Sequence, residues 1–239
     1  MSEHLDRLLA ASAQVFATPA DYQRVRTQLL AGLLNLGRHT VTGTLTTAGR
    51  QHHDWSADYR VWQRLPVDPL FHQLQQHTLA RSEGPWIVAM DDSATRKSGR
   101  RIPGCGWRRD PLSPPFHLNF CWGQRVLQCS AALSAPDGSA RLVPIDWTEA
   151  PLPRKPARQA TAEQWATYAE ARRQANLNTL AARRLAHLRT VTDRPIHCVV
   201  DGRFTNRTVL RQLPENTVLI GRIRKDTKLY AQAGPQAGI

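Results

Sequence analysis

Two short stretches of the chain place aspartate directly after a run of apolar residues. Asp91 and Asp92 follow the apolar run 86–90, and Asp201 follows the run 196–200. Each run has the length and composition of a buried β-strand. If the two strands are neighbours in a mixed sheet, their carboxyl ends emerge together and bring the carboxylates close to one another. Two such carboxylates repel each other unless a cation lies between them.

Paired carboxylates suit a hard divalent ion such as Mg²⁺ or Mn²⁺, which prefers oxygen ligands and keeps positions for water and a substrate phosphate. Two ions about 4 Å apart would activate a nucleophile and stabilise the leaving oxygen in phosphodiester chemistry. Basic residues follow the first acids closely, and we expect them to hold a nucleic-acid backbone: Arg96, Lys97, Arg100, Arg101, Arg108 and Arg109. A second interpretation stays open, because aspartate is also common in turns after strands and a basic stretch is often a solvated loop.

The charge of the whole chain agrees with a polyanionic partner. Lys and Arg number 32 against 19 Asp and Glu, which gives a net charge of +13. Residues 1–80 hold 7 of the bases and 6 of the acids, so residues 81–239 hold 32 − 7 = 25 bases and 19 − 6 = 13 acids. Most of the bases are arginine, whose planar fork suits phosphate. DNA is therefore the expected partner, although solubility or a base-rich genome would also explain the excess.

The elements that must position these residues fall into two groups. Residues 1–80 read as an all-helical domain, with amphipathic helices over 3–17 and 21–36 and a cap at Thr18 followed by Pro19. The stretch 37–50 fits a helix-turn-helix in which Arg38, His39 and Thr40 face DNA, and it fits a plain packing segment equally well.

Residues 84–239 read as a mixed α/β domain. Strands are expected over 85–90, 116–122, 125–135 and 139–147, the second and third being joined near Gly123. Thr161 and Gln164 form a capping box for one long helix that ends near residue 189. A strand over 195–202, a short helix over 204–213 and a strand over 216–224 follow. Three or four strands thus precede the first helix, and the expected order is β, β, β, helix, β, helix, β.

Other reactive side chains receive structural interpretations. The cysteines Cys105, Cys121, Cys129 and Cys198 lack a CxxC pair and read as buried free thiols. His52, His53 and Asp54 lack the further ligands that a structural zinc site needs. Trp55, Tyr59 and Trp62 are expected to form a corner that packs the helical domain against the other domain. Trp107 is expected in the core, with stacking on a base as the alternative.

Three motifs together resemble the DDE-type transposases of bacterial insertion sequences. They are "HDWSADYRVW", "VAMDDSATRKSGRRIPGCGWRRDPLSPPF" and "VVDGRFTNRTVL", and the resemblance spans about residues 35 to 230. It implies a ribonuclease H-like catalytic domain, preceded by a helical DNA-binding region, and two-metal cut-and-paste transposition. The family's first Asp has Thr or Ser two positions later, which selects Asp91 with Ser93 and leaves Asp92 as the runner-up. The second family Asp falls on Asp201.

The third carboxylate of the family, a Glu on a late helix, has no match in this chain. After Asp201 the only acids are Glu215, in a turn, and Asp226, in a basic loop. The chain therefore resembles the N-terminal two-thirds of a transposase, with its ribonuclease H-like domain incomplete at the C-terminus. An incomplete carboxylate set weakens metal binding and in-line geometry, so we expect little or no strand cleavage by this polypeptide alone.

Two other functions stay open. One is a non-catalytic DNA-binding remnant that inhibits a full-length transposase, and the other is a ribonuclease H-like nuclease unrelated to mobile DNA. The N-terminus lacks a signal sequence and no apolar run approaches 18 residues, so a cytoplasmic protein without membrane contact is expected. The resemblance alone implies a homo-oligomer acting on paired DNA ends.

Overall fold

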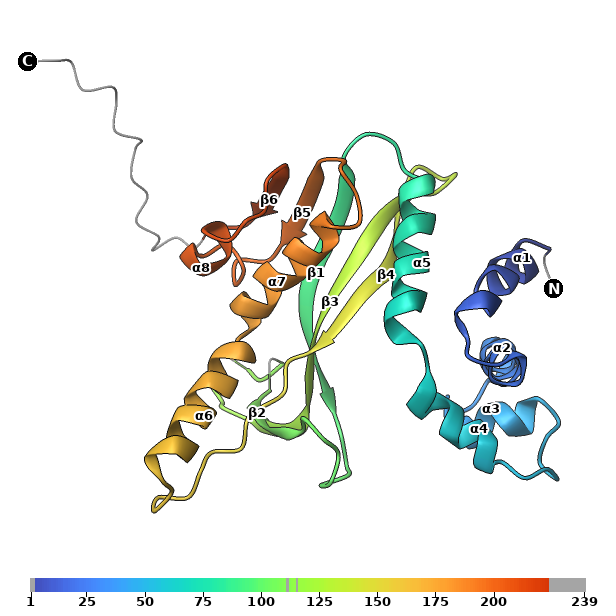
Figure 1. Cartoon of the computed structure of the whole chain (residues 1–239), viewed down its shortest axis with the longest axis horizontal. Coiled ribbons are helices and arrows are strands. Elements are labelled where there is room, and N and C mark those ends of the chain that lie inside the picture. The colour runs from blue at the N-terminus through green and yellow to red at the C-terminus, as the bar shows by residue number, and fades with distance from the viewer. Residues whose placement is uncertain (1–2, 111, 115, 224–239) are drawn as a thin grey trace, which may run out of the picture. The chain divides into compact units, whose positions relative to one another are not determined.

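The computed structural model describes residues 3–110, 112–114 and 116–223, and the chain divides into two compact units (Figure 1). The first unit is Met1–Leu74 and the second is Gln75–Ile239. The boundary falls inside α5 (Val67–Ala80), so the two ends of this helix belong to different units.

The first unit consists of helices and loops in its described residues. Thr18 caps the longest helix by accepting a hydrogen bond from the Asp21 N–H at 3.1 Å, and Pro19 occupies the first helical position, which confirms the expected helix start. The elements before α5 are α1 (Glu3–Ala11), η1 (Ala13–Val15), α2 (Pro19–Leu34), α3 (Val41–Thr47), α4 (Ser56–Arg60) and η2 (Val61–Arg64).

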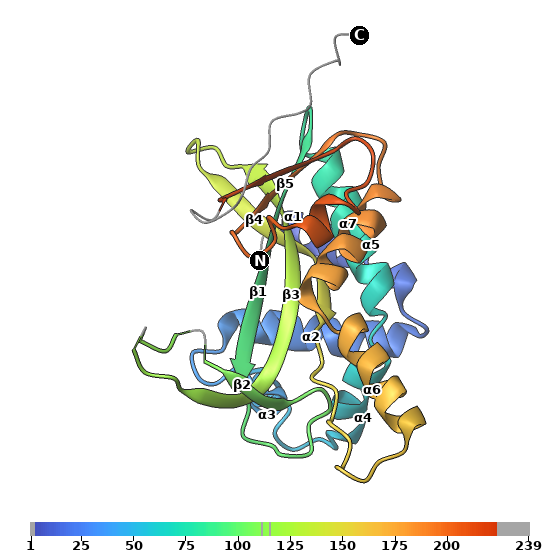
Figure 2. The same cartoon turned by 90° about the vertical axis from the view of Figure 1, so that its left-hand side faces the viewer.

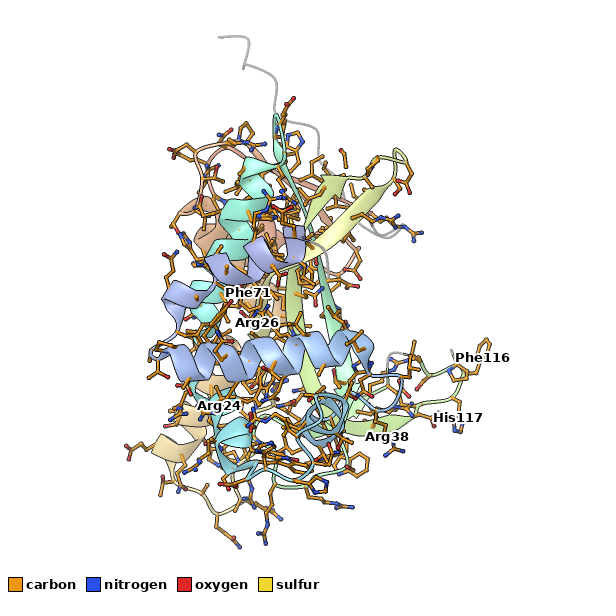
Figure 3. The ribbon with its side chains drawn as sticks, turned by 90° about the vertical axis from the view of Figure 1, so that its right-hand side faces the viewer. Arg24, Arg26, Arg38, Phe71, Phe116 and His117 are labelled. Atoms are coloured by element: carbon orange, nitrogen blue, oxygen red, sulfur yellow. The ribbon has the colours of Figure 1, made fainter. Side chains whose placement is uncertain are left out.

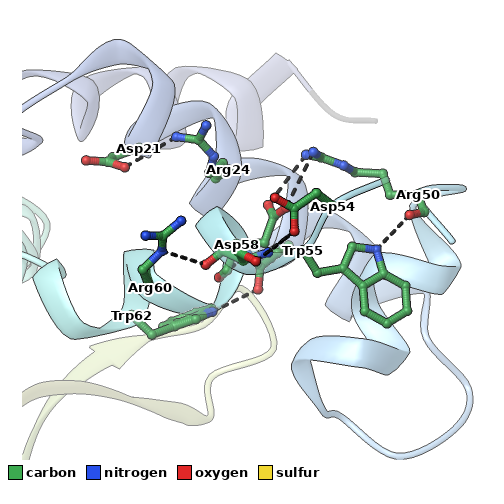
Figure 4. A network of polar contacts seen from close by, with 10 residues as sticks. Asp21, Arg24, Arg50, Asp54, Trp55, Asp58, Arg60 and Trp62 are labelled. Atoms are coloured by element: carbon green, nitrogen blue, oxygen red, sulfur yellow. Dashed lines mark hydrogen bonds and ion pairs between the residues drawn. The ribbon is translucent and has the colours of Figure 1, made fainter. Parts of the chain in front are cut away.

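A polar network around the buried Asp58 ties the first unit together (Figure 4). Arg50 lies 3.4 Å from the Asp58 carboxylate, and the Gln28 amide donates to the Asp58 carbonyl at 3.2 Å. The Trp62 indole N–H donates to Gln28 Oε1 at 2.8 Å, and the Trp55 indole N–H donates to the Arg50 carbonyl at 2.7 Å. Both tryptophans therefore find their hydrogen-bond partners inside the first unit.

Asp54 serves a local structural role at the start of α4. Its Oδ1 accepts hydrogen bonds from the Ser56 N–H at 2.9 Å and the Ser56 hydroxyl at 2.7 Å. These bonds, the backbone one first, lower the pKa of Asp54 below its ordinary value. The Asp54 carboxylate is thus engaged in hydrogen bonds with Ser56, the first residue of α4.

The second unit is built on one curled mixed sheet (Figure 2). The strand order is β2-β3-β1-β5-β6, with β4 pairing on β3. β1, β5 and β6 are parallel, whereas β3 runs antiparallel to β1, β2 and β4. The strands are β1 (Trp86–Arg96), β2 (Gly106–Arg109), β3 (Phe120–Ser134), β4 (Ala140–Glu149), β5 (Ile196–Val200) and β6 (Thr217–Gly221).

One face of the sheet carries the core of the second unit. Alternate residues of β1, namely Trp86, Val88 and Met90, are buried in one cluster with Leu185 and Leu188 of α7 (Leu177–Arg189). The period of two along the strand and the three-to-four spacing along the helix put these side chains together. Figure 1 shows α7 lying along β1 and β5. Val209 of the short α8 (Arg207–Leu210) belongs to the same cluster, and Leu79 of α5 packs against it. α6 (Ala162–Gln174) precedes α7 in the chain.

Several expected boundaries in this unit are wrong. β1 does not end at Met90 but continues to Arg96, because it goes on pairing with β3 after its pairing with β5 ends. The two strands expected on either side of Gly123 form one continuous strand, β3. A Cβ at Gly123 would lie 2.3 Å from the Thr95 carbonyl oxygen, so glycine here permits close approach to β1 and does not make a turn.

The long helix expected after Thr161 is two helices. Its capping box is confirmed, since the Thr161 hydroxyl accepts from the Gln164 N–H and the Gln164 side chain accepts from the Thr161 N–H. The break comes at Asn176, whose side chain accepts a hydrogen bond from the Asn178 N–H at 2.9 Å and starts α7 anew. Asparagine competes in this way with the continuing helix.

The four cysteines are all free thiols. Cys121, Cys129 and Cys198 are buried, which confirms the expectation for these three. Cys105 is only partly buried, because it lies in the loop between β1 and β2, outside the packed layers.

Candidate functional site

The two acid-terminated runs lie side by side in the sheet. β1 and β5 are parallel neighbours with Met90 opposite Val200, so Asp91 and Asp201 take the next position on each chain segment. Backbones of adjacent strands are about 4.8 Å apart, which is close enough for two carboxylates to share an ion. Both residues are exposed. An acidic edge therefore forms at the carboxyl end of β5, beside the middle of β1, which itself continues to Arg96.

The two carboxylates make only local hydrogen bonds. Asp91 Oδ1 accepts from the Asp92 N–H at 2.8 Å, and Asp201 Oδ1 accepts from the Arg203 N–H at 3.0 Å. Within the described residues neither Asp91 nor Asp201 forms an ion pair. Their remaining oxygens are available to an incoming cation.

Asp92 has different surroundings, because successive residues of a strand point to opposite faces. Its side chain is 12% exposed and forms ion pairs with Arg125 at 2.7 Å and Arg203 at 3.3 Å. Asp91 shares its face of β1 with Ile87, whereas Asp92 shares the face of the buried Met90. Asp92 is thus held by two arginines, whereas Asp91 has no ion-pair partner among the described residues.

The remaining acids do not complete a ligand cluster. In residues 3–223, as far as they are described, no group of three or more His, Cys, Asp or Glu side chains could hold a metal ion. Glu215 lies just before Thr217, which pairs with Ile196 at the amino end of the parallel strands. That end is opposite to the edge that carries Asp91 and Asp201. Asp226 lies outside the described residues.

The basic residues after β1 have unequal roles. Arg96 forms an ion pair with Asp110. Arg108 donates to the Ala150 carbonyl at 2.8 Å, and burial, followed by the charge of Arg125, lowers the pKa of Arg108. Both side chains are therefore partly committed to the fold.

The other four basic residues lie on or near the surface. Arg100 and Arg101 are exposed in the loop that joins β1 to β2, and Arg109 is exposed on β2. Lys97 is partly buried, with its backbone N–H donating to the Trp122 carbonyl at 3.0 Å. These residues keep their charged groups accessible to a polyanion.

A family comparison agrees with this arrangement. The family model described as DDE superfamily endonuclease matches residues 14–237. The chain belongs to this family. Neither the curated proteins nor the solved structures gave a match. The recognised resemblance to DDE-type transposases is thereby confirmed at the level of the family.

Membership in the DDE superfamily endonucleases indicates a nuclease with a DNA substrate, and nucleases of this family generally use divalent metal. The mixed α/β sheet with flanking helices is consistent with a nuclease domain of this family. Within the described part of the chain, no helix is long and apolar enough to cross a membrane.

The expectation that Trp107 packs in the core of this endonuclease is wrong. Its side chain is 55% exposed and packs edge to face on Trp122, with ring centroids 5.9 Å apart. Among the described strands β2 has β3 as its single neighbour, so it lies at the edge of the sheet. Trp107, Trp122 and Phe120 line a cavity of about 430 Å³ together with Arg96 and Lys97.

Two other exposed segments carry residues that sequence reasoning singled out or missed. The loop between α2 and α3 holds the exposed Arg38, whose carbonyl accepts from the Asn35 amide at 3.0 Å. Thr40 caps α3 by accepting from the Gly43 N–H at 3.0 Å. Figure 3 shows Phe116 and His117 projecting at the tip of the loop between β2 and β3. Phe116 is fully exposed and lies before β3, so the expectation that a strand begins at residue 116 is wrong.

Proposed function

We propose that this chain is a DNA transposase of the cut-and-paste type, in which Asp91 and Asp201 are metal ligands and Asp92 is not. The observation that carries the proposal is the parallel register of β1 and β5, which sets Asp91 of β1 beside Asp201 at the carboxyl end of β5. The antiparallel succession β4-β3-β1, continued by the parallel strands β5 and β6, supports a ribonuclease H-like domain over residues 84–239.

The donor set fits Mg²⁺ or Mn²⁺. Two exposed carboxylates without ion pairs in the described structure offer hard oxygen ligands and leave room for water and a phosphate. Divalent metal at this edge would supply the activation of water or of a 3′-hydroxyl for attack on a phosphodiester. Arg100, Arg101 and Arg109 lie farther along the sheet, in the loop after β1 and on β2, and would hold and orient the DNA backbone there.

The carboxylate set limits what this polypeptide does alone. Glu215 lies at the far end of the parallel strands and Asp92 is paired with Arg125 and Arg203. Among the described residues, Asp91 and Asp201 are therefore the two carboxylates at this edge that form no ion pair. Two ligands leave the coordination shell incomplete, and we expect little or no strand cleavage. This observation favours a second candidate function, a DNA-binding protein that occupies element ends without cutting them.

Metal binding tests the assignment of the two ligands. We expect Asp91→Asn and Asp201→Asn each to weaken Mn²⁺ binding, measured by titration calorimetry, by about tenfold or more, because each removes an anionic ligand. Asp137→Asn is the matched control, since Asp137 is exposed in the turn between β3 and β4. Equal affinity in the wild type, Asp91→Asn and Asp201→Asn would refute the site.

Nuclease assays separate the candidate functions. The protein is incubated with Mg²⁺ and either supercoiled DNA or an RNA–DNA hybrid. We expect tight DNA binding that weakens steeply with salt, with little cleavage of either substrate. Hybrid cleavage that is lost in Asp91→Asn would overturn the transposase proposal in favour of a ribonuclease. A flat salt dependence would contradict the phosphate-binding surface.

A further inference from the structure

A second basic site lies on the helix-covered side of the sheet, at the start of α7. A cavity of about 390 Å³ is lined there by four arginines that come from β2, β3, α6 and the loop after β5: Arg108, Arg125, Arg172 and Arg203. The backbone segments 150–153 and 175–178 complete the lining. The lining contains no acidic residue.

The charges around this cavity do not balance. Among the described residues, Asp92 is the carboxylate that forms ion pairs with these arginines, and it pairs with Arg125 and Arg203. Neither Arg108 nor Arg172 has an ion pair in the described part of the chain. One negative charge thus faces four positive charges.

The arginines are close enough to repel one another. Burial and then the charge of Arg125 act on Arg108, and both lower the pKa of Arg108. A cluster of like charges in a partly enclosed space lowers its free energy by taking up an anion. Guanidinium groups suit phosphate best, because their parallel N–H donors match two phosphate oxygens.

The start of α7 adds to the same field. This helix is 13 residues long, and its cap Asn176 and first residues Leu177 and Asn178 line the cavity. The amino end of a helix carries a partial positive charge and N–H groups that favour a bound phosphate. The amino end of α7 therefore adds positive potential to an anion site that the four arginines define.

We propose that this arginine pocket binds a phosphate group of a nucleic-acid strand. The nucleic-acid source rests on the proposed function, whereas the anion chemistry rests on the pocket itself. Asp92 is a positioning residue here: its two ion pairs hold Arg125 and Arg203 at the pocket. Asp91 and Asp92 then act on opposite faces of β1, the first toward metal and the second toward the arginines.

Arg172 offers a test that spares the fold. It is exposed on α6 and makes no hydrogen bond or ion pair in the described structure, so Arg172→Ala should leave stability unchanged. Arg173→Ala is the matched control, because Arg173 is on the same helix, pairs with Glu170 and does not line the pocket. Both variants remove one positive charge.

The probes are inorganic phosphate and a short single-stranded oligodeoxynucleotide with either a 5′-phosphate or a 5′-hydroxyl. We expect Arg172→Ala to weaken oligonucleotide binding about tenfold and to reduce the salt slope by about one, since one phosphate contact is lost. Arg173→Ala should change affinity by less than about twofold. A preference for the 5′-phosphate would identify a terminal monoester, and equal binding of both strands an internal diester.

Asp92→Asn tests whether removing the negative charge at the pocket strengthens or weakens phosphate binding. Asparagine keeps a side-chain oxygen that accepts a hydrogen bond from Arg125 or Arg203 but carries no negative charge. The positive potential of the pocket therefore rises, and inorganic phosphate should bind several-fold more tightly than in wild type. Asp137→Asn controls for the change in net charge. Weaker or equal phosphate binding in Asp92→Asn, with folding verified by circular dichroism, would overturn the pocket.

The outcomes also separate the pocket from the proposed function. Salt-dependent DNA binding with equal losses in Arg172→Ala and Arg173→Ala would reject the pocket and leave the transposase proposal standing. Binding of inorganic phosphate that Arg172→Ala abolishes, without binding of either oligonucleotide, would reject the nucleic-acid source and count against the transposase as well. If neither inorganic phosphate nor an oligonucleotide bound to the protein, the pocket would be rejected.

Discussion

At the residue scale, a single step along β1 changes what a carboxylate does. Asp91 is exposed beside the end of β5, whereas Asp92 is held by Arg125 and Arg203 on the other face. An aspartate with two arginine partners is already neutralised and is a poor ligand for a further cation, while an unpaired one is a good ligand. This contrast supports Asp91 as the proposed metal ligand and Asp92 as the residue that positions Arg125 and Arg203.

Trp107 carries a second prediction at this scale. Its exposed indole beside Phe120, Arg96 and Lys97 offers a stacking surface for an unpaired base. Trp107→Ala should weaken binding of single-stranded DNA by about 1–3 kcal/mol, and Trp107→Phe should retain most of the affinity. Fluorescence anisotropy with a labelled oligonucleotide measures both.

Trp147 supplies the control for this prediction. It is 44% exposed on β4 and does not line the same cavity. If Trp147→Ala weakened binding as much as Trp107→Ala, stacking at Trp107 would be ruled out as the cause.

At the scale of elements, Arg194 joins the end of α5 to the turn before β5. Its guanidinium donates to the carbonyls of Leu79 at 2.9 Å, Ser82 at 2.9 Å and Gly84 at 2.8 Å. Leu79 is in the last turn of α5, whose final carbonyls have no partner within the helix, whereas Ser82 and Gly84 follow the helix. One planar side chain thus joins the helix end to the segment after it. The bond from Gln75 to the Ile145 carbonyl at 2.9 Å fixes the same helix to β4.

Arg194→Lys should lower the free energy of unfolding by about 2 kcal/mol, because an ammonium cannot reach three divergent carbonyls. Urea denaturation measures the loss, and amide hydrogen exchange should show faster exchange at the end of α5. Arg183→Lys, at an exposed position of α7, is the control. A change below about 0.5 kcal/mol would show that water replaces the guanidinium without cost.

At the scale of the whole molecule, buried thiols couple folding to pH. Burial raises the pKa of Cys198 from 9.0 to about 12. Burial first, and then the charge of Asp146, raises the pKa of Cys129 well above 9.0. Because the folded protein holds these protons longer than the unfolded chain, stability is unaffected below pH 9 and falls as pH rises from 9 toward 12.

Each thiol should contribute a loss of about 1.4 kcal/mol per pH unit in that window. Urea denaturation at a series of alkaline pH values measures the slope. Cys198→Ala should be less stable than the wild type at neutral pH. Because it lacks one titrating thiol, its free energy of unfolding should fall less steeply with alkaline pH, by about 1.4 kcal/mol per pH unit. Parallel slopes in the variant and the wild type would contradict this account.

Much of the local structure could be predicted from short stretches of sequence. The caps at Thr18 and Thr161, the helical character of the first unit and the acid-terminated runs of β1 and β5 all depend on residues within a few positions of each other. The errors arose where distant partners decide the outcome. β1 extends past Met90 because β3 pairs with it, and Trp107 is exposed because β2 lies at the edge of the sheet.

The sequence by itself determined which residues could do chemistry: acids at strand ends, a surplus of arginine and a family pattern that covers most of the chain. Only the tertiary structure decided that Asp91 lies beside Asp201, that Glu215 lies at the other end of the strands, and that four arginines share one pocket. The physical reason is that strand register and the meeting of separate elements depend on long-range packing. Local propensity carries no information about which distant strand a segment will pair with.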